Sequence, residues 1–195
     1  ESVWREDNDS GLSGLLGRIK KSCKESDFYL NKIFDEGKVN SFALRLFFRL
    51  FPGELGTFYS RLQEKKDSLE FLSRVIKASC GLDAGLSLLI LKHIYSFSGE
   101  IIKVEAIKAM RKISKADETF LIAALKGSSR IIKKEVLLTL SNNKEALNAG
   151  LNELLNLPNF FGRNNRAILE NMSVIEELRL KEGELLLKNF TRMRF

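Results

Sequence analysis

A 30-residue internal repeat constrains the fold of this chain more than any other feature. When residues 98–127 are aligned with residues 128–157, eight of the thirty positions are identical. The identical pairs are Ser98/Ser128, Ile101/Ile131, Ile102/Ile132, Lys103/Lys133, Glu105/Glu135, Ala116/Ala146, Leu121/Leu151 and Leu125/Leu155. In each unit the apolar residues recur at three- and four-residue intervals in two stretches, which indicates two amphipathic helices. One helix pair cannot bury both of its apolar stripes, so we expect successive pairs to stack.

The rest of the chain also favours helices. Only two prolines occur in 195 residues, and no two-residue alternation is sustained, so we predict about twelve helices and no sheet. Breaking and capping residues mark the predicted helix ends. They are Pro52-Gly53, Asp67 with Glu70 as a capping box, Gly81 with Asp83, Ser98-Gly99, Asp117, Gly127 to Ser129, Asn142-Asn143, Pro158, and Ser173 with Glu176.

Composition divides the chain into three predicted regions. Residues 1–10 form a polar leader, residues 11–66 a Phe-rich helical part, and residues 67–195 the repeats with a C-terminal cap. We expect a further repeat unit over residues 161–190, at an offset of about 31 residues.

The two units, GEIIKVEAIKAMRKISKADETFLIAALKG and SRIIKKEVLLTLSNNKEALNAGLNELL, resemble HEAT repeats, in particular the short kind of bacterial PBS-lyase-type HEAT proteins. Ala106, Ala109 and Ala124 match positions where that family has small residues. The usual Gly-Asp turn is replaced by Lys115-Ala116-Asp117 and by Asn142-Asn143-Lys144. The resemblance implies an all-α fold, an α-solenoid in which antiparallel helix pairs form a right-handed superhelix. It also implies protein binding far more often than catalysis.

We therefore predict a non-catalytic scaffold that binds another protein along the concave face of the second helices. The residues predicted to line this face are Ala123, Lys126, Asn148, Asn152 and Glu153.

A nucleic-acid-binding module is the alternative, because the formal net charge is +7 and a row of cations can follow a phosphate backbone. Stacking would place Lys103 beside Lys133. The cations of this alternative are Lys103, Lys108, Arg111, Lys112, Arg130, Lys133 and Lys134. Interspersed acids, among them Glu135, favour instead a solvated outer face.

Phenylalanine accounts for 14 residues of the chain. Nine of these phenylalanines lie in the first half of the chain, between Phe28 and Phe97 and including Phe42, and we predict that they form the core. An excess beyond what the core needs would leave an exposed groove for a partner helix.

No catalytic or metal site is predicted, and no cofactor. The single histidine, His93, lies in an apolar helix without an obvious partner, so we expect a structural role. Gly11, Gly14 and Gly17 follow no strand, which argues against a phosphate loop. Cys23 and Cys80 are too far apart for a thiolate metal motif.

Free thiols suit a reducing compartment, and no apolar run reaches the ~20 residues of a spanning helix, so a cytoplasmic location is expected. Glu1 stands where an initiator Met would be, which predicts that sequence upstream was removed and leaves an upstream anchor or domain open.

Overall fold

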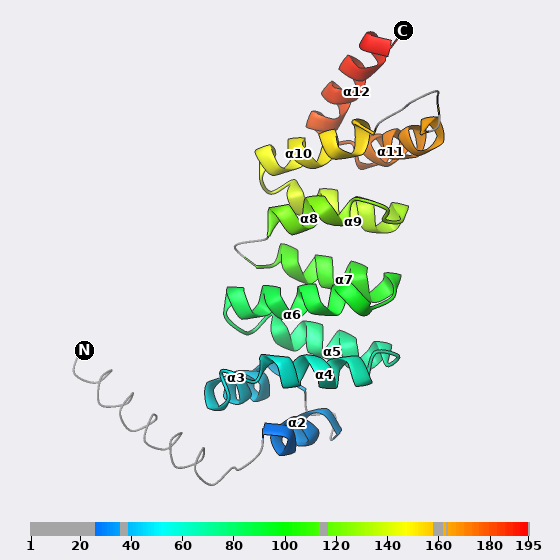
Figure 1. The fold of residues 1–195 in the computed structure, drawn as a ribbon. Coiled ribbons are helices and arrows are strands. Elements are labelled where there is room, and N and C mark those ends of the chain that lie inside the picture. The colour runs from blue at the N-terminus through cyan, green and yellow to red at the C-terminus, as the bar shows by residue number, and fades with distance from the viewer. Residues whose placement is uncertain (1–25, 36–38, 114–116, 158–161, 163, 195) are drawn as a thin grey trace, which may run out of the picture. The chain divides into compact units, whose positions relative to one another are not determined.

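The computed structural model describes residues 26–35, 39–113, 117–157, 162 and 164–194. These residues form eleven helices and no strand (Figure 1), so the all-α prediction is confirmed for the described part. The helices are α2 (Ser26–Asp35), α3 (Ser41–Leu50), α4 (Leu55–Glu64), α5 (Leu69–Ser79), α6 (Ala84–Phe97), α7 (Glu100–Arg111), α8 (Glu118–Ala124), α9 (Arg130–Leu140), α10 (Lys144–Leu155), α11 (Asn165–Leu178) and α12 (Lys181–Arg194). Contacts divide the chain into two compact units, unit 1 (Glu1–His93) and unit 2 (Ile94–Phe195).

Several helices begin at the capping residues that the sequence predicts. The side-chain oxygens of Asp83, Asp117 and Asn143 each accept a hydrogen bond from the backbone N–H three residues later, at 2.9, 3.0 and 3.4 Å. These bonds satisfy donors that the first helical turn leaves open.

Two predicted boundaries are wrong. The cap of α5 is Ser68 rather than Asp67, since the Ser68 hydroxyl accepts from the backbone N–H of Phe71. Ser173 and Glu176 lie inside α11, where the apolar stripe continues through buried Val174 and does not allow a break. Pro158 lies outside the described residues.

In unit 2, helices that are two apart along the chain pack on each other. α7 contacts α9 and α9 contacts α11, while α8 contacts α10 and α10 contacts α12. α9 also packs against α8 and α10, so it contacts four helices of the unit. α9 begins 30 residues after α7, as the repeat predicts, and α11 begins 35 residues after α9.

The repeat register agrees with burial in this unit. Ile102 and Ile132 are 2% and 5% exposed, and Leu121 and Leu151 are fully buried, so these identical pairs occupy core positions in both units. The two units also agree at a surface position, because Ile101 of α7 and its counterpart in α9 both have most of their side chains exposed to solvent.

The core of unit 1 is rich in phenylalanine, as the sequence predicts. Phe34 packs edge-on against Phe58 and Phe71, with ring centroids 5.5 and 4.9 Å apart. The prediction is wrong for Phe28 and Phe42, which are 54% and 74% exposed. A helix with apolar residues on most sides has more apolar surface than one core can cover, so α3 leaves Phe42 outside.

Candidate functional site

The residues predicted to line a concave face lie along α8 and α10. Ala123 and Asn152 are exposed, and Asn148 is half-buried on α10. Lys126, just after α8, forms an ion pair with Glu153 of α10, with 3.2 Å between Nζ and Oε1. The structure therefore brings two of the five side chains together, and these two satisfy each other's charge.

Most cations of the predicted row already contact other residues of unit 2. Lys103 Nζ lies 5.2 Å from the centroid of the Tyr95 ring, a cation–π distance. Lys133, its repeat counterpart, donates a hydrogen bond to Asn171 Oδ1 at 2.8 Å.

Three further cations bridge successive first helices of the repeat. Arg111 of α7 pairs with the largely buried Glu135 of α9. Arg130 and Lys134 of α9 both pair with Glu177 of α11, and the Arg130 contact is 2.7 Å long. The hydrogen bond from Arg130, and to a smaller extent that from Lys134, lowers the pKa of the Glu177 carboxyl. Glu135 thus pairs with one cation of the predicted row, but it is largely buried rather than part of a solvated outer face.

Lys108 and Lys112 remain of the seven predicted cations. Both are exposed, and neither has an ion pair or side-chain hydrogen bond with a residue that the structure describes.

Sequence reasoning missed Asn171, which is 2% exposed in α11. Its amide donates to the Leu154 carbonyl of α10 at 2.8 Å, while its Oδ1 accepts from Lys133 of α9. One buried side chain thus joins three helices. Its signal is a polar residue within the apolar stripe of Ile168, Val174 and Ile175.

His93 is packed against an aromatic ring. The imidazole stacks on Tyr59, with centroids 3.8 Å apart and 13° between planes, and its Nε2 lies 3.5 Å from Gln63 Nε2. Burial lowers the pKa of His93, and a backbone hydrogen bond involving Tyr59 partly opposes this effect. These contacts attach α6 to α4.

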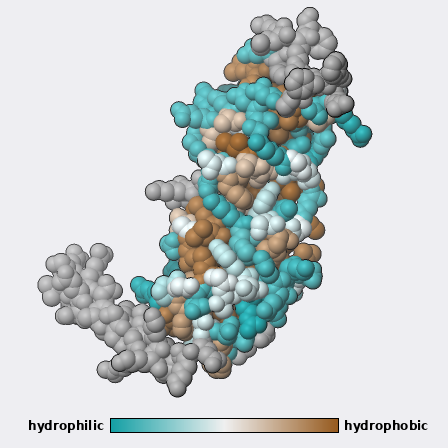
Figure 2. All heavy atoms as spheres, viewed as in Figure 1, coloured by the Kyte–Doolittle hydropathy of each residue, from teal (hydrophilic) through white to brown (hydrophobic). Residues whose placement is uncertain are grey.

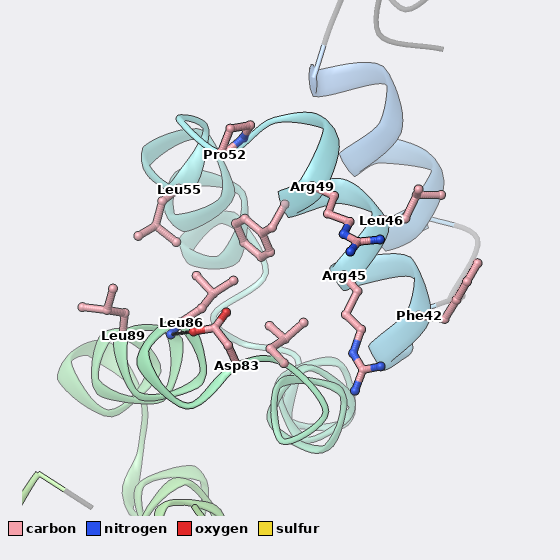
Figure 3. Close-up of a pocket in the computed structure, with 11 residues that line it drawn as sticks. Phe42, Arg45, Leu46, Arg49, Pro52, Leu55, Asp83, Leu86 and Leu89 are labelled. Carbon is pink, nitrogen blue, oxygen red and sulfur yellow. Dashed lines mark hydrogen bonds between the residues drawn. The ribbon is translucent and has the colours of Figure 1, made fainter. Parts of the chain in front are cut away.

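A pocket of about 800 Å³ in unit 1 is a further candidate binding site in the described residues. We call it the α3–α6 groove. It is lined by Phe42, Arg45, Leu46, Phe48, Arg49, Pro52, Leu55, Leu82, Asp83, Leu86 and Leu89. Figure 3 shows Arg45 and Arg49 extending from α3 on one side, with Leu86 and Leu89 of α6 on the other.

Large apolar side chains at this groove remain accessible. Phe42 is 74% exposed and Leu89 is 48% exposed. On the face drawn in Figure 2, hydrophobic surface occurs as separate patches among hydrophilic atoms. An apolar pocket with a few charged groups at its edge is the usual form of a binding site.

The charged groups of the groove have different local roles. Arg45 Nε donates to the Gly81 carbonyl at 2.5 Å, which ties α3 to the turn before α6. Asp83 caps α6. Arg49 is exposed and forms no ion pair with any residue in the described part of the chain.

Within the described residues, no group of three or more His, Cys, Asp and Glu side chains is arranged to hold a metal ion. No helix among them has the length and apolar character needed to cross a membrane. A scan against protein-family models, a search of curated proteins and a search of solved structures each found no match to the chain.

Proposed function

We propose that this chain is a non-catalytic protein-binding module built from stacked, HEAT-like helix pairs that form a right-handed superhelix. The packing order in unit 2 supports stacking, because α7, α9 and α11 contact in succession and so do α8, α10 and α12. Equal burial at positions 30 residues apart, as at Leu121 and Leu151, supports the repeat.

The α3–α6 groove is the observation that carries the binding role. Monomeric proteins seldom leave large apolar side chains together in a pocket, and such places mark interaction sites. Phe42 of α3 and Leu89 of α6 are two such exposed side chains, one on each wall of the groove. The face along α8 and α10 has less support, because it is polar and Lys126 already pairs with Glu153.

The nucleic-acid alternative also has less support. Five of its seven cations already contact an acid, an amide or an aromatic ring within unit 2. Each of these contacts would have to be weakened or shared before the cation could neutralise a phosphate.

The proposal is tested by selecting peptides that bind the immobilised full chain from a displayed library of random helical peptides. We expect enriched peptides that compete with one another for one site and lose binding to Phe42→Asp and Leu89→Asp variants. Both positions are exposed, so the variants should keep the helical circular dichroism of the parent.

Ile131→Asp is the matched control, because Ile131 is a 57%-exposed apolar residue outside the groove. Peptides that bind the Phe42→Asp variant and the parent equally would contradict the proposed site. A selection that enriches no peptide would contradict the proposed function.

A further inference from the structure

We propose that the α3–α6 groove binds a short acidic amphipathic helix, with apolar side chains in the groove and carboxylates facing Arg45 and Arg49. This inference rests on the protein-binding function proposed above and specifies its partner. It follows from the length of the groove wall, its apolar lining and its uneven charge.

The α3 wall of the groove has the length of about two helical turns. Its lining residues run from Phe42 to Arg49, and seven steps of 1.5 Å span roughly 10 Å. A partner helix presents apolar side chains at i, i+3 or i+4, and i+7 over the same distance. The groove volume of about 800 Å³ holds several such side chains.

The apolar lining comes from three helices and the turns beside them. Leu46 and Phe48 belong to α3, Leu55 to α4, and Leu86 and Leu89 to α6. Since Phe48 and the core behind it are already packed, an occupant gains contact chiefly with the accessible parts of Phe42 and Leu89. These two residues are therefore the anchors of the proposed interface.

The charge of the groove is positive along α3. Arg45 and Arg49 are four residues apart, so they lie on one face of the helix. A guanidinium has five N–H donors, and Arg45 uses Nε for the Gly81 carbonyl. Arg49 has no ion pair with a described residue. Both can therefore donate to carboxylates of a bound helix.

The one acid that lines the groove is on the opposite wall. Asp83 precedes α6, and one of its carboxylate oxygens accepts from the Leu86 backbone N–H. A helix in the groove thus faces two cations on its α3 side and one anion on the other. This asymmetry favours an occupant that carries acids along one edge, and it disfavours a basic one.

Three synthetic helical peptides of 16 residues test this charge preference. They share leucines at i, i+4, i+7 and i+11 and carry Glu, Gln or Lys along one flanking edge. Fluorescence anisotropy with the full chain should rank their affinities Glu, then Gln, then Lys. Raising NaCl from 50 to 300 mM should reduce the difference, because salt screens exposed charges.

Single substitutions test which residues of the groove cause the preference for an acidic peptide. Arg49→Gln should weaken the Glu peptide about two- to fivefold, the range for one exposed ion pair, and leave the Gln peptide unchanged. Asp83→Asn keeps a capping acceptor while removing the charge, so the Glu peptide should bind slightly more tightly. Lys77→Gln, an exposed cation of α5 that does not line the groove, should change nothing.

The outcomes separate the two proposals. Equal affinity of all three peptides, lost with Phe42→Asp, would overturn the acidic partner but keep the protein-binding function. A preference for the Lys peptide would also overturn it. Self-association of the chain in sedimentation, lost with Phe42→Asp, would identify a second copy as the occupant and overturn it as well. If no peptide binds and the library selection is also empty, both proposals fail.

Discussion

Replacing Gly150 by alanine should destabilise the protein, although alanine is the better helix former. Gly150 lies inside α10, where the change to alanine alone would stabilise by about 1 kcal/mol. A Cβ at this position would lie 2.8 Å from Leu140 Cδ1 and 3.4 Å from Leu125 Cδ1. Carbon atoms pack best at about 3.5–4.0 Å, so the Leu140 methyl group must move by roughly 0.7 Å or more.

The surroundings leave little room for that movement. Leu140 and Leu125 are 2% and 1% exposed, and overpacking a core of this kind costs about 1–3 kcal/mol. After subtraction of the helix gain, we expect a loss of about 1 kcal/mol, which is a fall in Tm of roughly 2–4 °C for a chain of this size. Thermal and urea unfolding followed by circular dichroism measure both quantities.

Gly56→Ala is the control for the intrinsic preference. Gly56 lies in α4, and a Cβ there has no other atom within 4 Å, so the change should be neutral or stabilising by up to about 1 kcal/mol. Leu140→Ala should cost less in the Gly150→Ala background than in the parent, since the added methyl group fills part of the cavity. Equal stabilisation by Gly150→Ala and Gly56→Ala would refute the steric argument.

Four further predictions concern burial, hydrogen bonding, pH and phosphate binding. Leu151→Ala should cost about 2–5 kcal/mol in urea unfolding, since the side chain is fully buried; a cost below 1 kcal/mol would contradict the register. Asn171→Ala should cost about 1–3 kcal/mol, because it leaves a buried carbonyl without its donor; no measurable change would mean that the bond adds nothing. Burial lowers the folded-state pKa of His93 below its usual 6.5, so stability should be full above about pH 6.5 and fall as pH decreases toward that lowered pKa, because the unfolded chain binds the proton more readily. His93→Gln should remove this dependence of stability on pH. If the variant keeps the same dependence, another group causes it. Duplex DNA should bind the chain more weakly than about 10 μM at physiological salt, with no effect of reversing Lys108 and Lys112 to Glu; tighter binding lost in that variant would restore the nucleic-acid alternative.

Local chemistry made several features of the fold predictable from sequence. Asp117 and Asn143 cap helices where a short polar side chain precedes an apolar stripe. The same rule failed at Asp67 and Ser68, because both residue types can cap and spacing does not choose between neighbours. It failed at Ser173 because packing of the surrounding stripe outweighs a local capping signal.

The candidate site was less predictable because it depends on which helix face packs inward. The high Phe content indicated either a larger core or an exposed groove, and only the packing of α3 leaves Phe42 outside. For the cations of α7 and α9, the repeat in the sequence indicated that they lie on the outer side of their helices, but not which acids they contact. That Arg111 meets Glu135, and that Arg130 meets Glu177, depends on the register between helices.

The short chain separation between contacting helices in unit 2 has a consequence for folding rate. Every helix pair with extensive contacts there consists of neighbours or of helices with one other helix between them. Chains with such local contacts lose little loop entropy before contacts form and refold in microseconds to milliseconds. Because α9 can pack on α7 and α8 before α11 is complete, unit 2 can begin to fold while its C-terminal residues are still being synthesised.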